Sequence, residues 1–109
     1  MTKVINCTPH DINLDLNGEI RTYEKSGIIP RMSVSETEAE SIGDVPCKKS
    51  IKGAVENLPE REDGVFLIVS GMIFDALSER DDLIAPNTGP SAIRNEKGHI
   101  VAVRNFLRR

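Results

Sequence analysis

Three arginines and a serine–glycine pair are the residues of this chain best suited to bind a charged ligand. Ser70-Gly71 follows an apolar run and precedes a short helical pattern. A corner between a strand and a helix presents free backbone N–H groups and the positive end of the helix dipole, which favour phosphate or carboxylate. Guanidinium groups bind phosphate through two parallel hydrogen bonds. Three of them fall on expected loops or strand ends: Arg31, Arg80 and Arg94.

A polar loop supplies further candidates for the same site. Asn87 and Thr88 could hydrogen-bond a base or a ribose, and Tyr23 or Phe74 could stack on a base, although Phe74 suits a core better. A structural interpretation stays open, in which Ser70 caps its helix and the arginines pair with acidic side chains. The predicted ligand-binding residues are Arg31, Ser70, Gly71, Arg80, Asn87, Thr88 and Arg94.

The two cysteines and two histidines are residue types found in zinc sites and nucleophilic sites. Cys7 and His10 stand three apart, whereas Cys47 and His99 have no such neighbour. Structural zinc sites usually take paired ligands from two tight turns. Cys7 also lies in an apolar strand pattern, where burial makes a thiol inert. We therefore expect neither a metal ion nor a cysteine nucleophile.

Two acidic arrangements are also expected to be structural. His10 and Asp11 are adjacent in an extended segment, so their side chains point to opposite faces and do not pair. Asp81-Asp82 could supply oxygens to a divalent cation, but a solvated run of charges after a helix explains them better. We assign no catalytic residue and no cofactor, and whether any catalysis occurs stays open.

Composition favours one small domain with a thin core. The chain has 109 residues, no Trp, one Tyr and three Phe, and aromatic side chains supply the greatest burial per residue. Residues 1–109 are expected to form a single domain, stabilised as a homo-oligomer. The net charge of −3 disfavours general nucleic-acid binding. No run spans a membrane and no signal peptide is visible, which predicts a cytoplasmic protein with reduced cysteines.

Strand patterns begin near the N-terminus. A short apolar run over 4–7 predicts a strand that ends at a polar corner, Thr8-Pro9-His10-Asp11, closed by hydrogen bonds from side chains to nearby backbone. Alternation over 12–16 predicts the next strand, and Asn17-Gly18 signals a hairpin. We expect a three-residue loop that sets Leu14 opposite Ile20, because a two-residue loop would split the apolar face.

The middle of the chain admits two interpretations. Residues 32–35 alternate like a strand, whereas Ser35-Glu36-Thr37-Glu38 has the form of a capping box for a helix that ends at Gly43. The strand is favoured, but helix and strand both stay open for 36–42. Residues 45–51 predict a further strand that carries Lys48 and Lys49.

The second half holds the strongest signal. Residues 65–69 predict a strand covered on both faces, followed by a short helix that packs Ile73, Phe74 and Leu77 on the sheet. Residues 81–90 predict a long ordered loop. Residues 93–94 and 99–103 predict a hairpin with Ile93 opposite Ile100. Together the patterns predict an α+β fold, a small single domain dominated by an antiparallel or mixed β-sheet with hairpins and one or two short helices.

Several short motifs resemble those of a widespread family of short phage- and prophage-encoded proteins with an N-terminal Asn-x-Thr-Pro-His-Asp-Ile motif. Here the residues are Asn6-Cys7-Thr8-Pro9-His10-Asp11-Ile12, with Arg80-Asp81-Asp82-Leu83 and Arg94-Asn95-Glu96-Lys97-Gly98 further along. The resemblance spans nearly the whole chain. Leu is the residue expected at the position of Cys7, which disfavours a metal or nucleophile role for this thiol. The resemblance implies a protein made in the cytoplasm of an infected bacterial host, and supplies no reaction.

Small phage proteins with thin cores often counter bacterial defences, and some oligomerise to sequester nucleotide-derived signals between subunits. By that analogy we expect an anti-defence sponge that binds a phosphorylated immune signal, a cyclic nucleotide or an NAD-derived cyclic ADP-ribose, without cleaving it. One alternative is a protein–protein inhibitor or virion accessory protein that acts through a sheet edge or the acidic segment from Glu36 to Asp44. The other is a small phosphodiesterase that uses His10 or His99.

Overall fold

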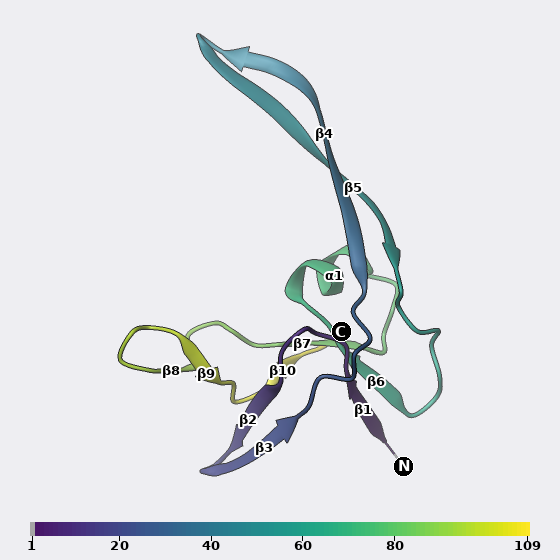
Figure 1. Ribbon diagram of the computed structural model, residues 1–109, viewed down its shortest axis with the longest axis vertical. Coiled ribbons are helices and arrows are strands. Elements are labelled where there is room, and N and C mark those ends of the chain that lie inside the picture. The colour runs from purple at the N-terminus through teal and green to yellow at the C-terminus, as the bar shows by residue number, and fades with distance from the viewer. Residues whose placement is uncertain (1) are drawn as a thin grey trace.

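A mixed four-stranded sheet forms the body of the computed structural model, which describes residues 2–109 apart from the side chain of Lys52. The sheet has the order β1-β6-β7-β10, in which β1, β6 and β7 run parallel and β10 pairs antiparallel with β7. Its strands are Lys3–Asn6, Val65–Ile68, Leu83–Pro86 and Phe106–Leu107. Figure 1 shows the hairpins projecting from this body.

The apolar run at 65–69 lies at the centre of the core, as its pattern predicted. Leu67, Ile68 and Val69 are fully buried, because β6 has a parallel neighbour on each side. Helix α1 (Gly71–Ala76) follows and packs Ile73 and Phe74 into the same core. The C-terminal Arg109 donates to the carbonyls of Phe74 and Leu77 and lies over the Phe74 ring, so the chain end covers the end of this helix.

Strand β7 corrects the expected loop at 81–90. Leu83 and Ala85 are buried, and β7 pairs with β6 on one side and β10 on the other. The segment from 83 to 86 holds few residues and ends in a proline, so its strand signal was masked by the polar residues around it. The loop proper begins after Pro86 and is therefore shorter than predicted.

The first hairpin joins β2 (Ile12–Leu16) and β3 (Glu19–Tyr23) in a register that contradicts the expected one. Leu14 pairs with Arg21, and Asp15 pairs with Ile20. Both loop residues, Asn17 and Gly18, have positive φ angles of 55° and 97°, the geometry of a tight two-residue turn. Apolar residues of β2 and β3 do not need to lie opposite each other, because Leu14 is buried next to Val103, with which it forms a bridge, while Ile20 stays 55 % exposed.

The second hairpin joins β4 (Arg31–Ile42) and β5 (Val45–Glu56), each twelve residues long. The strand interpretation of 36–42 is therefore correct, and the expected strand at 45–51 extends to Glu56. Gly43 has a φ angle of 63° and lies in the tight turn between the strands rather than at the end of a helix. This hairpin rises away from the body (Figure 1), and Val55, near its root, packs against the core.

The third hairpin joins β8 (Ile93–Arg94) and β9 (Ile100–Ala102), as expected, but its register differs from the prediction. Ile93 pairs with Ala102 rather than Ile100, and Arg94 pairs with Ile100. The cause lies in the turn, where the Asn95 side-chain oxygen accepts from the backbone N–H groups of Lys97 and His99. This turn leaves one extra residue on β9 and produces a bulge.

The described residues form a strand-rich molecule with antiparallel and mixed sheets and one short helix, so the expected dominance of strands is confirmed. The Cα radius of gyration is 16.9 Å, whereas a compact domain of this length has about 13 Å. The long β4–β5 hairpin accounts for the difference, since the molecule measures 53 Å along its longest axis and 24 Å along its shortest.

Candidate functional site

The N-terminal motif folds into a corner held by the side chain of Asn6. Its amide nitrogen donates to the carbonyls of His10 and Tyr23, each at 2.8 Å, and its oxygen accepts from the backbone and hydroxyl of Thr8. Asn6 is 2 % exposed, so these bonds satisfy a buried amide completely. Asp11 accepts from the backbone N–H of Lys25 at 2.9 Å. The side chains of this motif therefore hold the backbone of the corner in place, as the sequence predicted.

The Ser70-Gly71 corner lies between β6 and α1. The Ser70 hydroxyl accepts from the Ile73 backbone N–H at 3.4 Å, so it is the N-cap of the helix. Both residues are exposed, but α1 has only six residues and a correspondingly weak dipole at its N-terminus. Ser70 therefore has the capping role that the sequence suggested. Apart from this cap, the corner has little with which to bind a ligand.

Arg80 is engaged by its own neighbours. Its guanidinium donates twice to the Asp82 carboxylate, at 2.8 and 2.7 Å, and once to the carbonyl of Pro59 at 3.0 Å. The Asp82 side chain is 4 % exposed, and the Arg80 hydrogen bonds hold the pKa of its carboxyl below the ordinary value. Arg80 therefore ties the segment before β6 to the start of β7.

The remaining predicted residues lie apart from that pair. Arg31 is exposed at the root of the β4–β5 hairpin. The Asn87 amide donates to the side chain of Asn105 at 2.8 Å, and its oxygen accepts from Gly89. Arg94, on the β8–β9 hairpin, donates to the carbonyls of Gly98 at 2.8 Å and Thr88 at 3.5 Å. The fold brings Thr88 and Arg94 together, and places Arg31 on β4, Arg80 between α1 and β7, and Arg94 on β8.

The other chemical candidates also have local partners. Asp81 accepts from Arg61, which leaves each residue of the Asp81-Asp82 pair bonded to an arginine. Cys7 and Cys47 are free thiols, and burial raises the pKa of the Cys7 thiol. Within residues 2–109 as described, no three His, Cys, Asp or Glu side chains gather as metal ligands. None of the described helices is long and apolar enough to cross a membrane.

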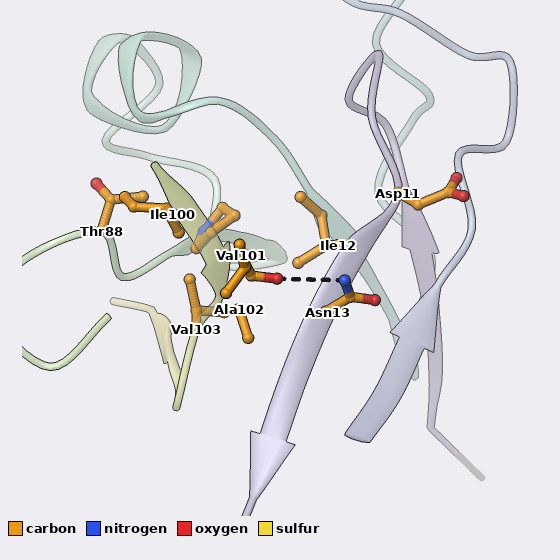
Figure 2. A pocket seen from close by; sticks show the side chains of 9 residues that line it. Asp11, Ile12, Asn13, Thr88, Ile100, Val101, Ala102 and Val103 are labelled. Carbon is orange, nitrogen blue, oxygen red and sulfur yellow. Dashed lines mark hydrogen bonds between the residues drawn. The ribbon is translucent and has the colours of Figure 1, made fainter. Parts of the chain in front are cut away.

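Pockets indent the surface of the described residues at several places. One, about 150 Å³, lies between β2 and β9 and is lined by apolar residues together with Asp11, Asn13 and Thr88. Figure 2 shows this pocket and the Asn13 side chain donating to the Val101 carbonyl, at 3.2 Å, across the gap between the strands. A second, about 390 Å³, lies at the root of the long hairpin. The third, about 590 Å³, is lined by Arg94, Lys97 and His99 with their neighbours. None of the three is lined by Ser70 or Gly71.

The β4–β5 hairpin has two chemically different faces. One face holds Val34, Glu36 and Glu38 of β4, and Ser50 and Lys48 of β5 pair with the two glutamates. Lys48 lies 3.6 Å from Glu38. We call this the charged face. Because side chains alternate along a strand, the opposite face holds the pairs Ser35–Ile51, Thr37–Lys49 and Ala39–Cys47. A register shift between Ala39 and Ile42 then brings the Ile42–Val45 pair at the tip onto the same face. We call this second set the apolar face.

The apolar face is open to solvent. Ile42 is 74 % exposed, Val45 is 55 % exposed and Ile51 is 45 % exposed. Sequence reasoning treated 36–42 as ambiguous and so missed a surface made by two strands together. The signal was present: alternation along 45–51 places Val45, Cys47 and Ile51 on one side. Only the cross-strand register joins this stripe to Ala39 and Ile42.

Comparisons with family models, with curated proteins and with solved structures found no match for this chain.

Proposed function

We propose that this protein is a binding protein that engages another protein chain through its β4–β5 hairpin. The single observation that supports the proposal is the exposed apolar face on a projecting two-stranded arm. Isolated two-stranded ribbons are at best marginally stable in water, and exposed apolar surface of this kind typically marks an interaction site. In an infected bacterium, the setting implied by the resemblance to phage proteins, such a protein would act as an inhibitor of another protein or as an accessory of the virion.

Site-specific photocrosslinking tests this proposal. A photoreactive amino acid replaces Ile42 on the apolar face in one variant and Glu36 on the charged face in the other, in bacteria that produce the protein. We expect protein adducts, with this chain or a different one, from position 42 and far fewer from position 36. Equal yields at both positions, or none at either, would contradict the proposal.

Small-molecule sequestration is a second candidate, favoured by the pocket beside Arg94. Lys97 and His99 line the same depression. Among the described residues, carbonyls accept from two donors of the Arg94 guanidinium, which leaves three N–H groups for a phosphate. Thr88 accepts one of those bonds and so lies at the same hairpin. The predicted roles of Ser70, Gly71, Arg31, Arg80 and Asn87 in such a site stay predictions.

Calorimetry with a panel of cyclic nucleotides and cyclic ADP-ribose derivatives tests the second candidate. We expect Arg94→Ala to weaken any binding at least tenfold, and Arg21→Ala, which removes an exposed arginine on a different hairpin, to leave it unchanged. Mass spectrometry of the recovered ligand separates sequestration from cleavage, because a phosphodiesterase would return a ligand of changed mass. Absence of heat across the panel would count against this candidate.

A further inference from the structure

The β2–β3 turn contains an asparagine followed by a glycine, the pair in which a side-chain carboxamide is most readily attacked by the backbone. Asn17 and Gly18 are both exposed. Glycine has no Cβ to hinder its nitrogen. Beyond its chain neighbours, no described atom lies within 4 Å of the position that a Cβ would take at Gly18. This turn therefore combines a carboxamide with an accessible backbone nitrogen.

The reaction open to this pair is intramolecular deamidation. The Gly18 backbone nitrogen attacks Cγ of the Asn17 carboxamide, so that a bond forms between these two atoms and the bond from Cγ to the side-chain nitrogen breaks. That nitrogen leaves as ammonia with the proton lost by the Gly18 amide, and a five-membered cyclic imide remains. Water then opens the ring at Cγ to give aspartate, or at the backbone carbonyl carbon to give isoaspartate.

The backbone of the turn is one rotation away from the conformation that the ring requires. Both φ angles are positive, at 55° for Asn17 and 97° for Gly18, as in a type I′ turn, where the second nitrogen points away from the first side chain. Rotation of the peptide plane between the two residues brings the Gly18 nitrogen beside Cγ and makes the turn type II′. This rotation keeps the positive φ of Asn17 and reverses the sign of φ at Gly18, which glycine tolerates.

Asp15 holds the turn in its starting conformation. Its carboxylate accepts from the Gly18 backbone N–H at 2.6 Å, a short bond of the charge-assisted kind. Rotation of the peptide plane turns this N–H away from the carboxylate and breaks the bond. Asp15 is itself anchored to the body, because its backbone N–H donates to the Val103 carbonyl at 2.8 Å. The reactive geometry is therefore reached only when the bond between Asp15 and Gly18 opens.

We propose that Asn17 is a site of spontaneous deamidation, and that Asp15 sets its rate by restraining the Gly18 amide. Isoaspartate adds one carbon to the backbone of a two-residue turn, and both products add a carboxylate close to Asp15. The Leu16–Glu19 pair beside the turn then loses the geometry that sets its register. The modification therefore loosens the β2–β3 hairpin slowly. It is independent of the β4–β5 arm, so it stands or falls separately from the proposed function.

A second asparagine provides an internal control. Asn57 is also exposed and has a positive φ of 62°. The next residue is Leu58, whose side chain hinders attack by its own backbone nitrogen and packs against the core. Asn57 should therefore stay intact while Asn17 is converted.

Peptide mass spectrometry of the purified protein during incubation in mildly alkaline buffer tests the site. Fragment masses should locate at position 17 the gain in mass that separates a carboxylate from a carboxamide, and an isoaspartyl methyltransferase should label the isoaspartate product. We expect the folded wild type to be converted more slowly than the same protein unfolded in urea. No conversion at position 17 in the folded protein, or equal conversion at positions 17 and 57, would overturn the site.

Two substitutions test the role of Asp15. Asp15→Ala removes the acceptor and should speed conversion of the folded protein by about threefold or more. Asp15→Asn retains a neutral acceptor and should give an intermediate rate. Glu19→Ala is the matched control, because it removes an exposed carboxylate at the other side of the turn while the Gly18 N–H stays bonded to Asp15. It should leave the rate unchanged.

Hydrogen exchange of the β2 amides, measured in parallel, separates restraint of one amide from unfolding of the hairpin. We expect exchange along β2 in Asp15→Ala to match that in wild type while conversion at position 17 becomes faster. A rate in Asp15→Ala equal to or below the wild-type rate would overturn the restraint. Faster conversion that occurs only together with faster exchange along β2 would also overturn it, because the whole hairpin would then have opened.

Discussion

At the scale of single residues, the buried polar groups of this molecule hold its fold together rather than form a reactive site. Asn6 satisfies four hydrogen-bonding groups from a position that is 2 % exposed. Arg80 and Asp82 form a pair in which the carboxylate is almost fully enclosed. Both lie within motifs on which the resemblance to phage proteins was based. Those motifs therefore describe how the chain folds at least as much as what it binds.

Asn6→Ala should lower the free energy of unfolding by about 2–4 kcal/mol, because it leaves the His10 and Tyr23 carbonyls without their donor in a poorly solvated corner. Urea denaturation measures the change. Asn105→Ala removes a single exposed side-chain bond to Asn87 and should cost about 0.5 kcal/mol or less. Equal costs for the two substitutions would show that the corner does not depend on Asn6.

The Arg80–Asp82 pair predicts a specific dependence of stability on pH. The Asp82 pKa is below its ordinary value because Arg80 donates to the carboxylate. A depressed folded-state pKa contributes stability above the unfolded value of about 3.9, and that contribution is lost as pH falls further through the folded pKa.

Asp82→Asn should therefore reduce stability at pH 7 by about 1–3 kcal/mol and flatten the loss of stability below about pH 4. Denaturant midpoints across pH 2 to 7 provide the measurement. Asp81→Asn removes an ion pair in which both side chains are well exposed and should change the profile less, because solvent screens such pairs. A steeper acid dependence in Asp82→Asn than in wild type would contradict the assigned cause.

At the scale of elements, the sequence predicted those whose signal is local. The apolar run at 65–69, the Ser70-capped helix and the N-terminal corner were all recognised, because their signals lie within a few adjacent residues. The registers of the β2–β3 and β8–β9 hairpins were wrong. Register there depends on the Asn17-Gly18 backbone and on the Asn95 side-chain bonds, which the apolar pattern does not encode.

The candidate site was predicted less well than the fold, for a physical reason. Arginines attract carboxylates and carbonyls of their own chain, and only the fold decides which of them come within reach. Arg80 donates to the carboxylate of Asp82, two residues away, and Arg94 donates to the carbonyl of Gly98 across a turn. The apolar face escaped notice because its residues come from two strands, and only the pairing of those strands assembles them.

Helix α1 offers a prediction that separates capping from ligand binding. Ser70→Ala should destabilise the protein by about 1 kcal/mol, because the Ile73 N–H loses its acceptor. Ser70→Asp should restore the stability, since a carboxylate also caps and favours the positive helix end. Thermal denaturation compares the three proteins. A neutral Ser70→Ala would mean that the cap does not stabilise the helix.

At the scale of the whole molecule, the chain divides into a small packed body and an arm that contributes little to the core. The fully buried side chains lie in the body, on β1, β6, β7 and the adjoining residues. The arm adds length without burial, and its root contacts the core through Val55. Binding of a partner would stabilise an arm of this kind, because its own two strands bury few side chains.

The arm should therefore open more readily than the body. In the purified protein, hydrogen exchange should be faster for amides along β4 and β5 than for amides along β1, β6 and β7, because an exposed hairpin can open without unfolding the body. Exchange measured at each backbone amide checks this. Equal protection of the arm and the body would show that the arm is stable by itself, and an interaction site on the arm would lose its physical basis.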